Sequence, residues 1–360
     1  MQNRTIKSIQ ALRFVFCMFI FAFHFRGMII KTDIFTYGGD AGVSFFFILS
    51  GFVLCLGCGR RVEEGNFREV PFLRSRLLKI YPLHLVALLI ALAFSLYMGE
   101  KFRPGAFAAQ LCFAQSWFLS RSMILYCNGV SWFLGPLFLC YALFSWLYRN
   151  IVVRRCRNKL FIVVAVAYLA AYSLVSCVSD RVVDDYFNGF PPLRIADFTV
   201  GILAYSVFRS GTGRCLQRRL MSAGVAWLTV FDLLCVAAVA ATYVAYQYLP
   251  SWFRFSMLFW IPFSAVICYF ALTDEDGGLV SRLFRSRPVQ FLGNISFEIY
   301  MLHIIAITVA TYIYGHTVGY DNIFMPALAA LSLVVTLLMS MVAKRFVETV
   351  YFMVCTKNNN

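Results

Sequence analysis

Long apolar runs, each bounded by basic or polar residues, follow one another along the whole 360-residue chain. A transmembrane helix needs about 20 mostly apolar residues to cross the hydrocarbon core of a bilayer. The pattern therefore predicts an all-α polytopic membrane protein with about ten transmembrane helices. The predicted spans are residues 8–30, 39–58, 77–98, 129–148, 160–178, 192–209, 222–246, 251–272, 291–314 and 324–343.

One further apolar segment, residues 106–119, is too short to cross a membrane comfortably. Gln110 and Gln115 also give this segment a polar side. We expect a short re-entrant or interfacial helix there. The spans together predict one transmembrane domain over residues 1–350, followed by a short cytosolic tail at residues 351–360.

Lys and Arg are divided unevenly between alternate loops. When the N-terminus is placed in the cytosol, the cytosolic loops hold dense basic clusters, as around residues 60–79, 149–159 and 209–219, and the opposite loops hold few. Cytosolic loops of membrane proteins carry such an excess. Both termini are therefore predicted to be cytosolic. The net charge of +15 is then explained by topology, and no nucleic-acid partner is expected.

Composition supports the membrane assignment. Hydrophobic residues make up 61% and charged residues 14% of the chain, whereas a soluble domain has roughly 45–50% and 25%. A chain of this composition cannot cover itself with polar surface, so membrane lipid is part of its solvent. The cysteines lie mostly inside apolar runs without paired ligand spacing, so we interpret them as small core residues and expect no metal site.

Within the first predicted span, the run of residues 11–25 holds two ionisable residues, Arg13 and His24, and is otherwise apolar. Eleven residues are close to three whole helical turns, which places both side chains on one face, about 16 Å apart. A charged residue inside a span is costly and usually lines a functional cavity. The alternative is that each side chain reaches the nearer headgroup region. An imidazole suits proton removal from an alcohol, and a guanidinium suits an anionic donor group or a developing oxyanion.

The Arg13 and His24 spacing, with further segments in order downstream, resembles the acyltransferase-3 family of bacterial membrane O-acyltransferases. Two positions depart from the family pattern: residues 135–137 lack the Glu of many members, and residues 348–350 lack the frequent Glu-x-Pro. The resembling segments are Tyr37–Phe52, the basic loop Phe72–Pro82, Cys112–Trp117, Ser131–Leu134, Ile195–Gly201 and Gly293–His303.

The resemblance implies an enzyme that moves an acyl group, commonly acetyl, from cytosolic acyl-CoA to a hydroxyl of an extracytoplasmic glycan or lipid-linked sugar. Acetyl-CoA would be the donor substrate, and no cofactor would be bound permanently. The protein would lie in the bacterial inner (cytoplasmic) membrane. His24 would accept the proton of the acceptor hydroxyl, and Arg13 would hold the acyl donor or stabilise charge.

Other candidate residues come from the same segments. Each also has an ordinary structural explanation, such as loop anchoring by arginine, helix packing at Ser50 or interfacial anchoring by tryptophan. Arg194 and Asp197 are three residues apart, which predicts a local ion pair. The donor-binding candidates are Arg74, Arg76, Lys79 and Tyr81. The site-lining or acceptor-binding candidates are Asp40, Ser50, Trp117, Trp132, Glu298, Tyr300 and His303.

Two other classes of protein compete with the enzyme. A polytopic transporter or flippase of a glycolipid or polysaccharide precursor would also have many spans with buried charges, but inverted repeats and paired broken helices are typical of it. None is evident in the sequence. A purely structural membrane protein gives no reason for Arg13 and His24 to share a face. Consumption of acetyl-CoA distinguishes the enzyme from both.

Overall fold

The protein, seen in a computed structural model, is described over residues 6–25, 37–118, 120–176, 189–319 and 324–356, and these parts contain helices and connecting turns without strands. Eight helical stretches among them are long and apolar enough to cross a membrane. The prediction of an all-α polytopic protein is confirmed at this level. The eight are Lys7–Phe25, Gly38–Glu63, Glu69–Tyr97, Gly129–Val153, Val225–Tyr248, Ser251–Leu272, Ser296–Val318 and Met325–Met353.

Each of the ten predicted spans contains a helix. The two outside the set of eight are α7 (Arg157–Ser176), whose apolar part is short, and α9 (Pro191–Phe208), which carries Arg194 and Asp197. The number ten and the cytosolic termini stay predictions. The other helices are α1 (Lys7–Phe25), α2 (Gly38–Glu63), α3 (Glu69–Tyr97), α4 (Pro104–Leu111), α5 (Arg121–Ile124), α6 (Leu134–Tyr148), α10 (Gly211–Met221), α11 (Val225–Ala245), α12 (Ser251–Arg254), α13 (Met257–Leu272), α14 (Leu279–Phe284), α15 (Arg287–Asn294), α16 (Ser296–Val318) and α17 (Met325–Thr356).

The segment expected to be re-entrant or interfacial forms short pieces of helix and no span. The helix α4 ends at Leu111, a 3₁₀ turn follows at Gln115–Trp117, and α5 is a single turn. Phe113 has φ of 58° between the first two pieces, a left-handed conformation that stops a helix. A second 3₁₀ turn, Gly129–Phe133, leads into α6.

Two predicted boundaries differ from the structure. The basic segment Phe72–Pro82, expected as a loop, is helical because α3 already begins at Glu69 and continues through Pro82. Proline removes one backbone hydrogen bond from a helix, a loss that membrane helices tolerate when neighbouring groups compensate for it. At the other end of the chain α17 runs to Thr356, past the expected boundary at residue 350.

The chain divides into two compact units, each assembled from separated segments. Unit 1 comprises residues 1–16, 37–69 and 136–294, and unit 2 comprises residues 17–36, 70–135 and 295–360. The division falls inside α1, so this helix contributes its first half to unit 1 and its second half to unit 2.

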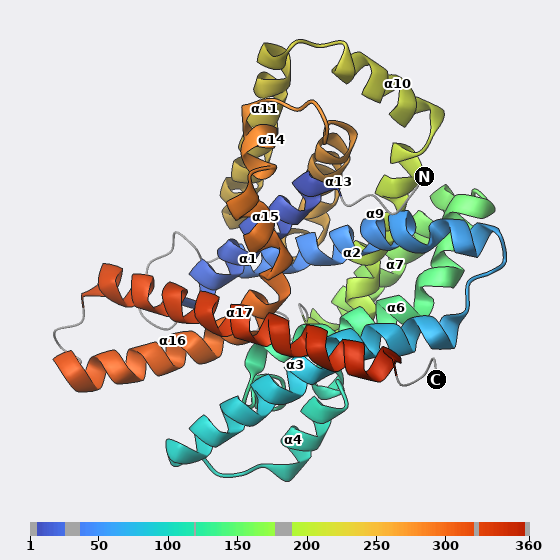
Figure 1. Cartoon of the computed structure of the whole chain (residues 1–360). Coiled ribbons are helices and arrows are strands. Elements are labelled where there is room, and N and C mark those ends of the chain that lie inside the picture. Colours follow the sequence, from blue (N-terminus) through green and yellow to red (C-terminus); the bar gives the residue numbers. More distant parts are fainter. Residues whose placement is uncertain (1–5, 26–36, 119, 177–188, 320–323, 357–360) are drawn as a thin grey trace. The chain divides into compact units, whose positions relative to one another are not determined.

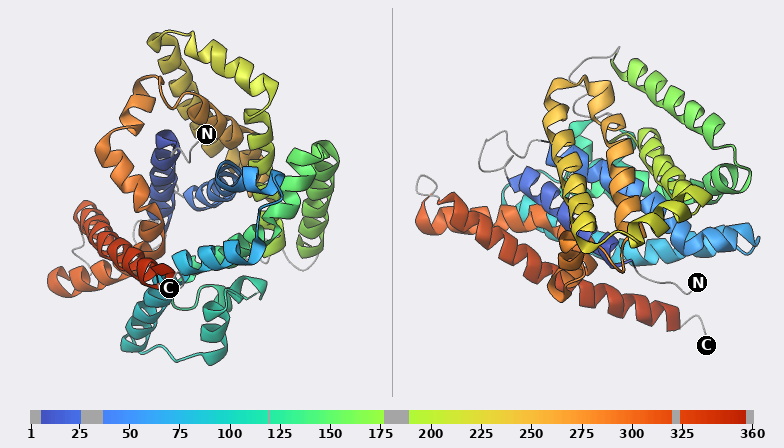
Figure 2. Two further views of the ribbon diagram at one scale, coloured as in Figure 1. Left: turned by 45° about the vertical axis from the view of Figure 1, so that its right-hand side comes forward. Right: turned by 90° about the horizontal axis from the view of Figure 1, so that it is seen from above.

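Unit 1 is built around the pair α2 and α9, which approach each other closely at two glycines. A Cβ on Gly201 would collide with the backbone oxygen of Ile48, and one on Gly51 with the backbone oxygen of Phe198. Small residues allow such close approach of membrane helices. The helix α13 packs on both α2 and α9, and α11 lies beside α13 (Figure 2). The resulting interior holds the buried polar residues described below.

Unit 2 is built around the antiparallel pair α16 and α17, which lie side by side (Figure 1). The second half of α1 packs on this pair through an apolar cluster that contains Phe21, Phe25, Ile307, Ala310 and Leu328. The thiol of Cys17 donates a hydrogen bond to the backbone oxygen of Ser296, at 3.3 Å. This packing fixes the face of α1 that carries His24 against α16.

Candidate functional site

Two histidines from distant parts of the sequence meet in unit 2. His24 on α1 and His303 on α16 are joined by a hydrogen bond between His24 Nδ1 and His303 Nε2, at 2.9 Å. The ring centroids are 4.9 Å apart. Both residues were predicted as candidates, His24 as the base and His303 as a residue that lines the site or binds the acceptor. The structure brings them together as one polar pair inside an apolar surrounding.

The two rings differ in exposure and in their other contacts. His303 is 1% exposed, and its Nδ1 lies 2.7 Å from the backbone oxygen of Tyr300. His24 is only partly buried, and its Nδ1 also lies 3.0 Å from the backbone oxygen of Ile20. His24 is therefore the more exposed of the two rings.

Tyr300 belongs to the same group of side chains as the histidine pair. Its ring centroid lies 6.0 Å from that of His303, and its hydroxyl donates to the backbone oxygen of Val130 at 2.8 Å. The side-chain amide of Asn128 donates to the backbone oxygen of Met301 at 3.1 Å. These two bonds tie the segment before α6 to the turn of α16 that precedes His303.

A buried polar network continues from this segment, and sequence reasoning assigned it no role. The hydroxyl of Ser131 donates to Gln110 Oε1 at 3.2 Å, and the Gln115 side-chain amide donates to the Ser131 hydroxyl at 3.2 Å. His84 Nε2 lies 2.9 Å from the backbone oxygen of Gln110. Gln110 and Gln115 had been recognised only as a polar side of a short helix. The spacing of Gln110 and Gln115 in the sequence does not reveal that both bond to Ser131.

Glu298 is a further buried candidate on α16. It is 2% exposed, and its Oε1 is 3.5 Å from the Lys344 Nζ of α17. This contact gives the buried acid a basic partner. On the helix α16, five residues separate Glu298 from His303, which turns the two side chains toward different faces.

The donor-binding candidates occupy the first turns of α3. Arg74 and Lys79 are exposed, while Arg76 and Tyr81 are partly buried. The Arg76 guanidinium lies 5.1 Å from the ring centroid of Phe72, and Lys79 Nζ lies 5.1 Å from that of Tyr351 on α17. The cluster is thus positioned by α3 and the end of α17.

The two tryptophans in the list of candidates lie near the same segment. Trp117 is 49% exposed, and Trp132 is partly buried. The Ser116 hydroxyl donates to the backbone oxygen of Trp132 at 2.8 Å, which joins the two tryptophan-bearing turns. Their rings are therefore available at the surface of unit 2, as both sugar stacking and interfacial anchoring require.

The remaining candidates lie in unit 1. Arg13 is partly exposed on α1, with Gln10 Oε1 3.4 Å from its guanidinium. Asp40, in the first turn of α2, accepts a hydrogen bond from the Tyr246 hydroxyl. The Ser50 hydroxyl donates to the backbone oxygen of Phe46 at 2.6 Å, the ordinary bond of a serine inside a helix.

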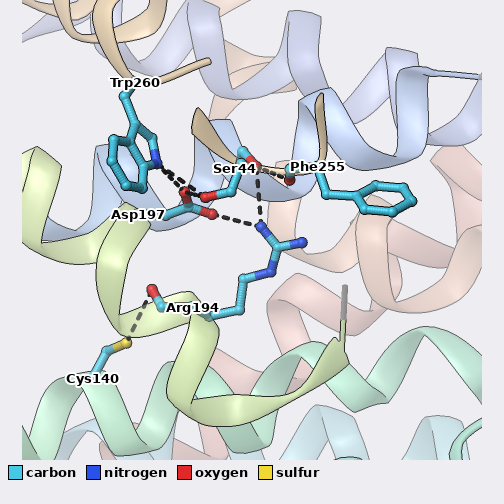
Figure 3. Close-up of polar contacts among 7 residues, drawn as sticks. Ser44, Cys140, Arg194, Asp197, Phe255 and Trp260 are labelled. Atoms are coloured by element: carbon cyan, nitrogen blue, oxygen red, sulfur yellow. Dashed lines mark hydrogen bonds and ion pairs between the residues drawn. The ribbon is translucent and has the colours of Figure 1, made fainter. Parts of the chain in front are cut away.

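A second buried polar cluster lies in unit 1, around Arg194 and Asp197 of α9 (Figure 3). The Arg194 guanidinium donates to Asp197 Oδ2 at 2.5 Å and to the Ser44 hydroxyl at 3.0 Å. Asp197 Oδ1 accepts from the indole N–H of Trp260 at 2.7 Å and from the Ser256 hydroxyl. The predicted local ion pair is confirmed, and its additional partners come from α2 and the start of α13.

This second cluster differs from the histidine pair in accessibility. Arg194 is 2% exposed and Asp197 0%. The charges face each other and neighbouring hydroxyl and indole groups, as is typical of a structural ion pair. We therefore assign the Arg194 and Asp197 cluster to the fold of unit 1.

Comparison with known proteins gives the same class of activity. The family model for an acyltransferase domain, Acyl_transf_3, matches residues 6–345. The acyltransferase MdmB of Streptomyces mycarofaciens is 27% identical over 330 residues, which cover 87% of this chain and 79% of that protein. The "protein 2 in picA locus" of Rhizobium radiobacter is 30% identical over 149 residues, 38% of this chain and 76% of that protein. No solved structure matches the chain significantly.

Proposed function

Because the chain belongs to the acyltransferase-3 family, we propose that it transfers an acyl group, acetyl by default, from cytosolic acyl-CoA to a hydroxyl of an extracytoplasmic glycan or lipid-linked sugar. The observation that carries this proposal is the partly exposed His24, hydrogen-bonded to the buried His303. Membership of an acyltransferase family favours acyl transfer over transport. The His24 imidazole, held by a hydrogen bond to His303, supports the same conclusion.

The reaction needs a base and no redox step. The acceptor hydroxyl gives its proton to His24 as its oxygen bonds to the carbonyl carbon of the thioester. The carbon–sulfur bond then breaks, and the CoA thiolate leaves with the proton returned by His24. A positioned base of this kind contributes about 10²–10⁴-fold to a rate. Arg13, on the same helix, is the cation that we assign to the acyl donor or to the developing oxyanion.

Acyl-CoA enters as a substrate, and the basic first turns of α3 are suited to its phosphates. Arginine binds phosphate through charge-assisted, often bidentate hydrogen bonds. The proposed location is the bacterial cytoplasmic membrane, with this basic cluster facing the cytosol, as the distribution of Lys and Arg among the loops predicts.

The proposal is tested with the full-length protein in proteoliposomes and with intact cells. Labelled acetyl-CoA is added to vesicles that contain the protein and cell-envelope glycan from a strain that lacks it, and transfer of label to glycan is measured. Glycan from cells with and without the protein is compared by mass. We expect labelled glycan and a mass difference of one acyl unit. Substrate movement across the vesicle without acyl-CoA consumption would instead support the transporter.

Replacing Arg76 by alanine is expected to raise the KM for acyl-CoA with little change in kcat. One hydrogen bond to a charged group contributes about 1.5–3 kcal/mol, which corresponds to roughly a 10–100-fold change in KM. Initial rates over a range of acyl-CoA concentrations measure both constants. Arg68→Ala is the matched control, because this exposed arginine lies just before α3 and we expect it to leave KM unchanged. Equal effects of the two substitutions would reduce the role of Arg76 to general surface charge.

A further inference from the structure

The hydrogen bonds of the two histidines determine which ring nitrogen carries a proton. A backbone carbonyl oxygen only accepts hydrogen bonds, so a ring nitrogen that faces one must be the protonated nitrogen. His303 Nδ1 faces the backbone oxygens of Tyr300 at 2.7 Å and Ile299 at 3.2 Å. In its neutral form His303 therefore carries its proton on Nδ1, and its Nε2 offers a lone pair.

The protonation of His303 determines which nitrogen of His24 carries a proton. Because His303 Nε2 accepts, the His24 Nδ1 that lies 2.9 Å away must donate. His24 Nδ1 also faces the backbone oxygen of Ile20 at 3.0 Å, and this contact requires a proton on the same nitrogen. Neutral His24 is thus left with its lone pair on Nε2, the nitrogen turned away from both of these partners.

The His303 ring is held more firmly than the His24 ring. His303 is 1% exposed and lies in the interior of unit 2. The ring centroids of Phe21 and Tyr300 lie 6.2 Å and 6.0 Å from that of His303. The Tyr300 hydroxyl is itself bonded to the backbone oxygen of Val130. The backbone oxygen of Tyr300, the buried His303 ring and the partly exposed His24 ring are therefore joined in sequence by hydrogen bonds.

We propose that His303 is a positioning residue, which holds the proton of His24 on Nδ1 so that His24 Nε2 is the base of the transfer reaction. This inference rests on the proposed function. When His24 Nε2 takes the proton of the acceptor hydroxyl, the Nδ1–H bond to His303 becomes a charge-assisted bond, which is stronger than the neutral one. The proton leaves from Nε2 to the CoA thiolate, so His303 is neither protonated nor consumed.

Two substitutions at His303 distinguish positioning from packing. A glutamine side chain places its oxygen close to the position of Nε2, whereas the shorter asparagine reaches only the region of Nδ1. We expect His303→Gln to keep kcat within about tenfold of the wild type, since its oxygen still accepts from His24 Nδ1. We expect His303→Asn to lower kcat by about 10²–10⁴-fold, the range of a general base, with the KM for acyl-CoA unchanged.

A spectroscopic measurement tests the assignment without relying on activity. The chain has only four histidines, so ¹⁵N-histidine-labelled protein in lipid nanodiscs gives few signals, which single substitutions can assign. At a pH where both rings are neutral, we expect His24 and His303 to carry hydrogen on Nδ1 and bare Nε2. In His303→Asn we expect the His24 signals to change toward a mixture of the two tautomers.

The outcomes separate this inference from the function on which it rests. If the wild type transfers no acyl group, the proposed function fails. If the wild type is active and His24→Ala is not, while His303→Gln loses as much activity as His303→Asn, then His303 acts otherwise than as an acceptor and the inference is overturned. Wild-type kcat in His303→Asn, or a neutral His24 with hydrogen on Nε2, overturns it as well.

Discussion

Replacing His24 by alanine is expected to abolish most acyl transfer, with kcat falling by about 10²–10⁴-fold. The side chain is partly exposed, and His303 supports it from behind with a 2.9 Å hydrogen bond. Alanine removes the proposed proton acceptor and leaves the helix intact, because alanine has the highest helix propensity. Initial rates with labelled acetyl-CoA at saturating acceptor measure the loss.

The control for this substitution is His316, a histidine on α16, the helix that carries His303. His316 lies in the last turn of α16 and is exposed, so His316→Ala changes the same residue type outside the site. We expect His316→Ala to transfer at the wild-type rate. Should His24→Ala and Arg13→Ala each keep wild-type transfer at normal expression, the roles assigned to the first helix would be wrong.

Hydropathy predicted most of the helices because span length and apolar content are local properties of the chain. The helices α1, α2, α11 and α16 overlap the expected segments, with ends displaced by up to five residues. Helix ends are set by local capping and packing, which a hydropathy window averages over. The start of α3 was missed for this reason, since the charged residues around Arg74 lower the average although they are helical.

The partners of the site residues could be predicted only where they are close in sequence. The ion pair of Arg194 with Asp197 spans three positions of one helix and was predicted. The bond between His24 and His303 spans 279 positions, and no local pattern relates such residues. In the sequence, His24 and His303 each stand inside an apolar run. This pattern identifies each of them as a candidate, but it does not indicate that they contact each other.

Replacing Asp197 by alanine is expected to destabilise unit 1 strongly. The substitution removes the carboxylate that faces the Arg194 guanidinium at 2.5 Å, and both side chains are buried. Removal of one partner of a buried ion pair costs about 3–5 kcal/mol, because the remaining charge stays in the interior uncompensated. Thermal unfolding of the purified protein in detergent, followed by intrinsic fluorescence, measures the change as a lower Tm and a smaller folded yield.

Two further variants determine whether burial of the charge causes this loss. In Arg194→Leu combined with Asp197→Leu, both charges are replaced by apolar side chains, a change that is often neutral or stabilising for a buried pair. We therefore expect this double variant to regain most of the lost Tm. Glu64→Ala breaks the exposed pair with Arg60, whose atoms lie 2.6 Å apart, and water solvates the remaining charge, so we expect little change in Tm. A double variant as unstable as Asp197→Ala would instead assign the stability to the bonds with Ser256 and Trp260, which both variants lose.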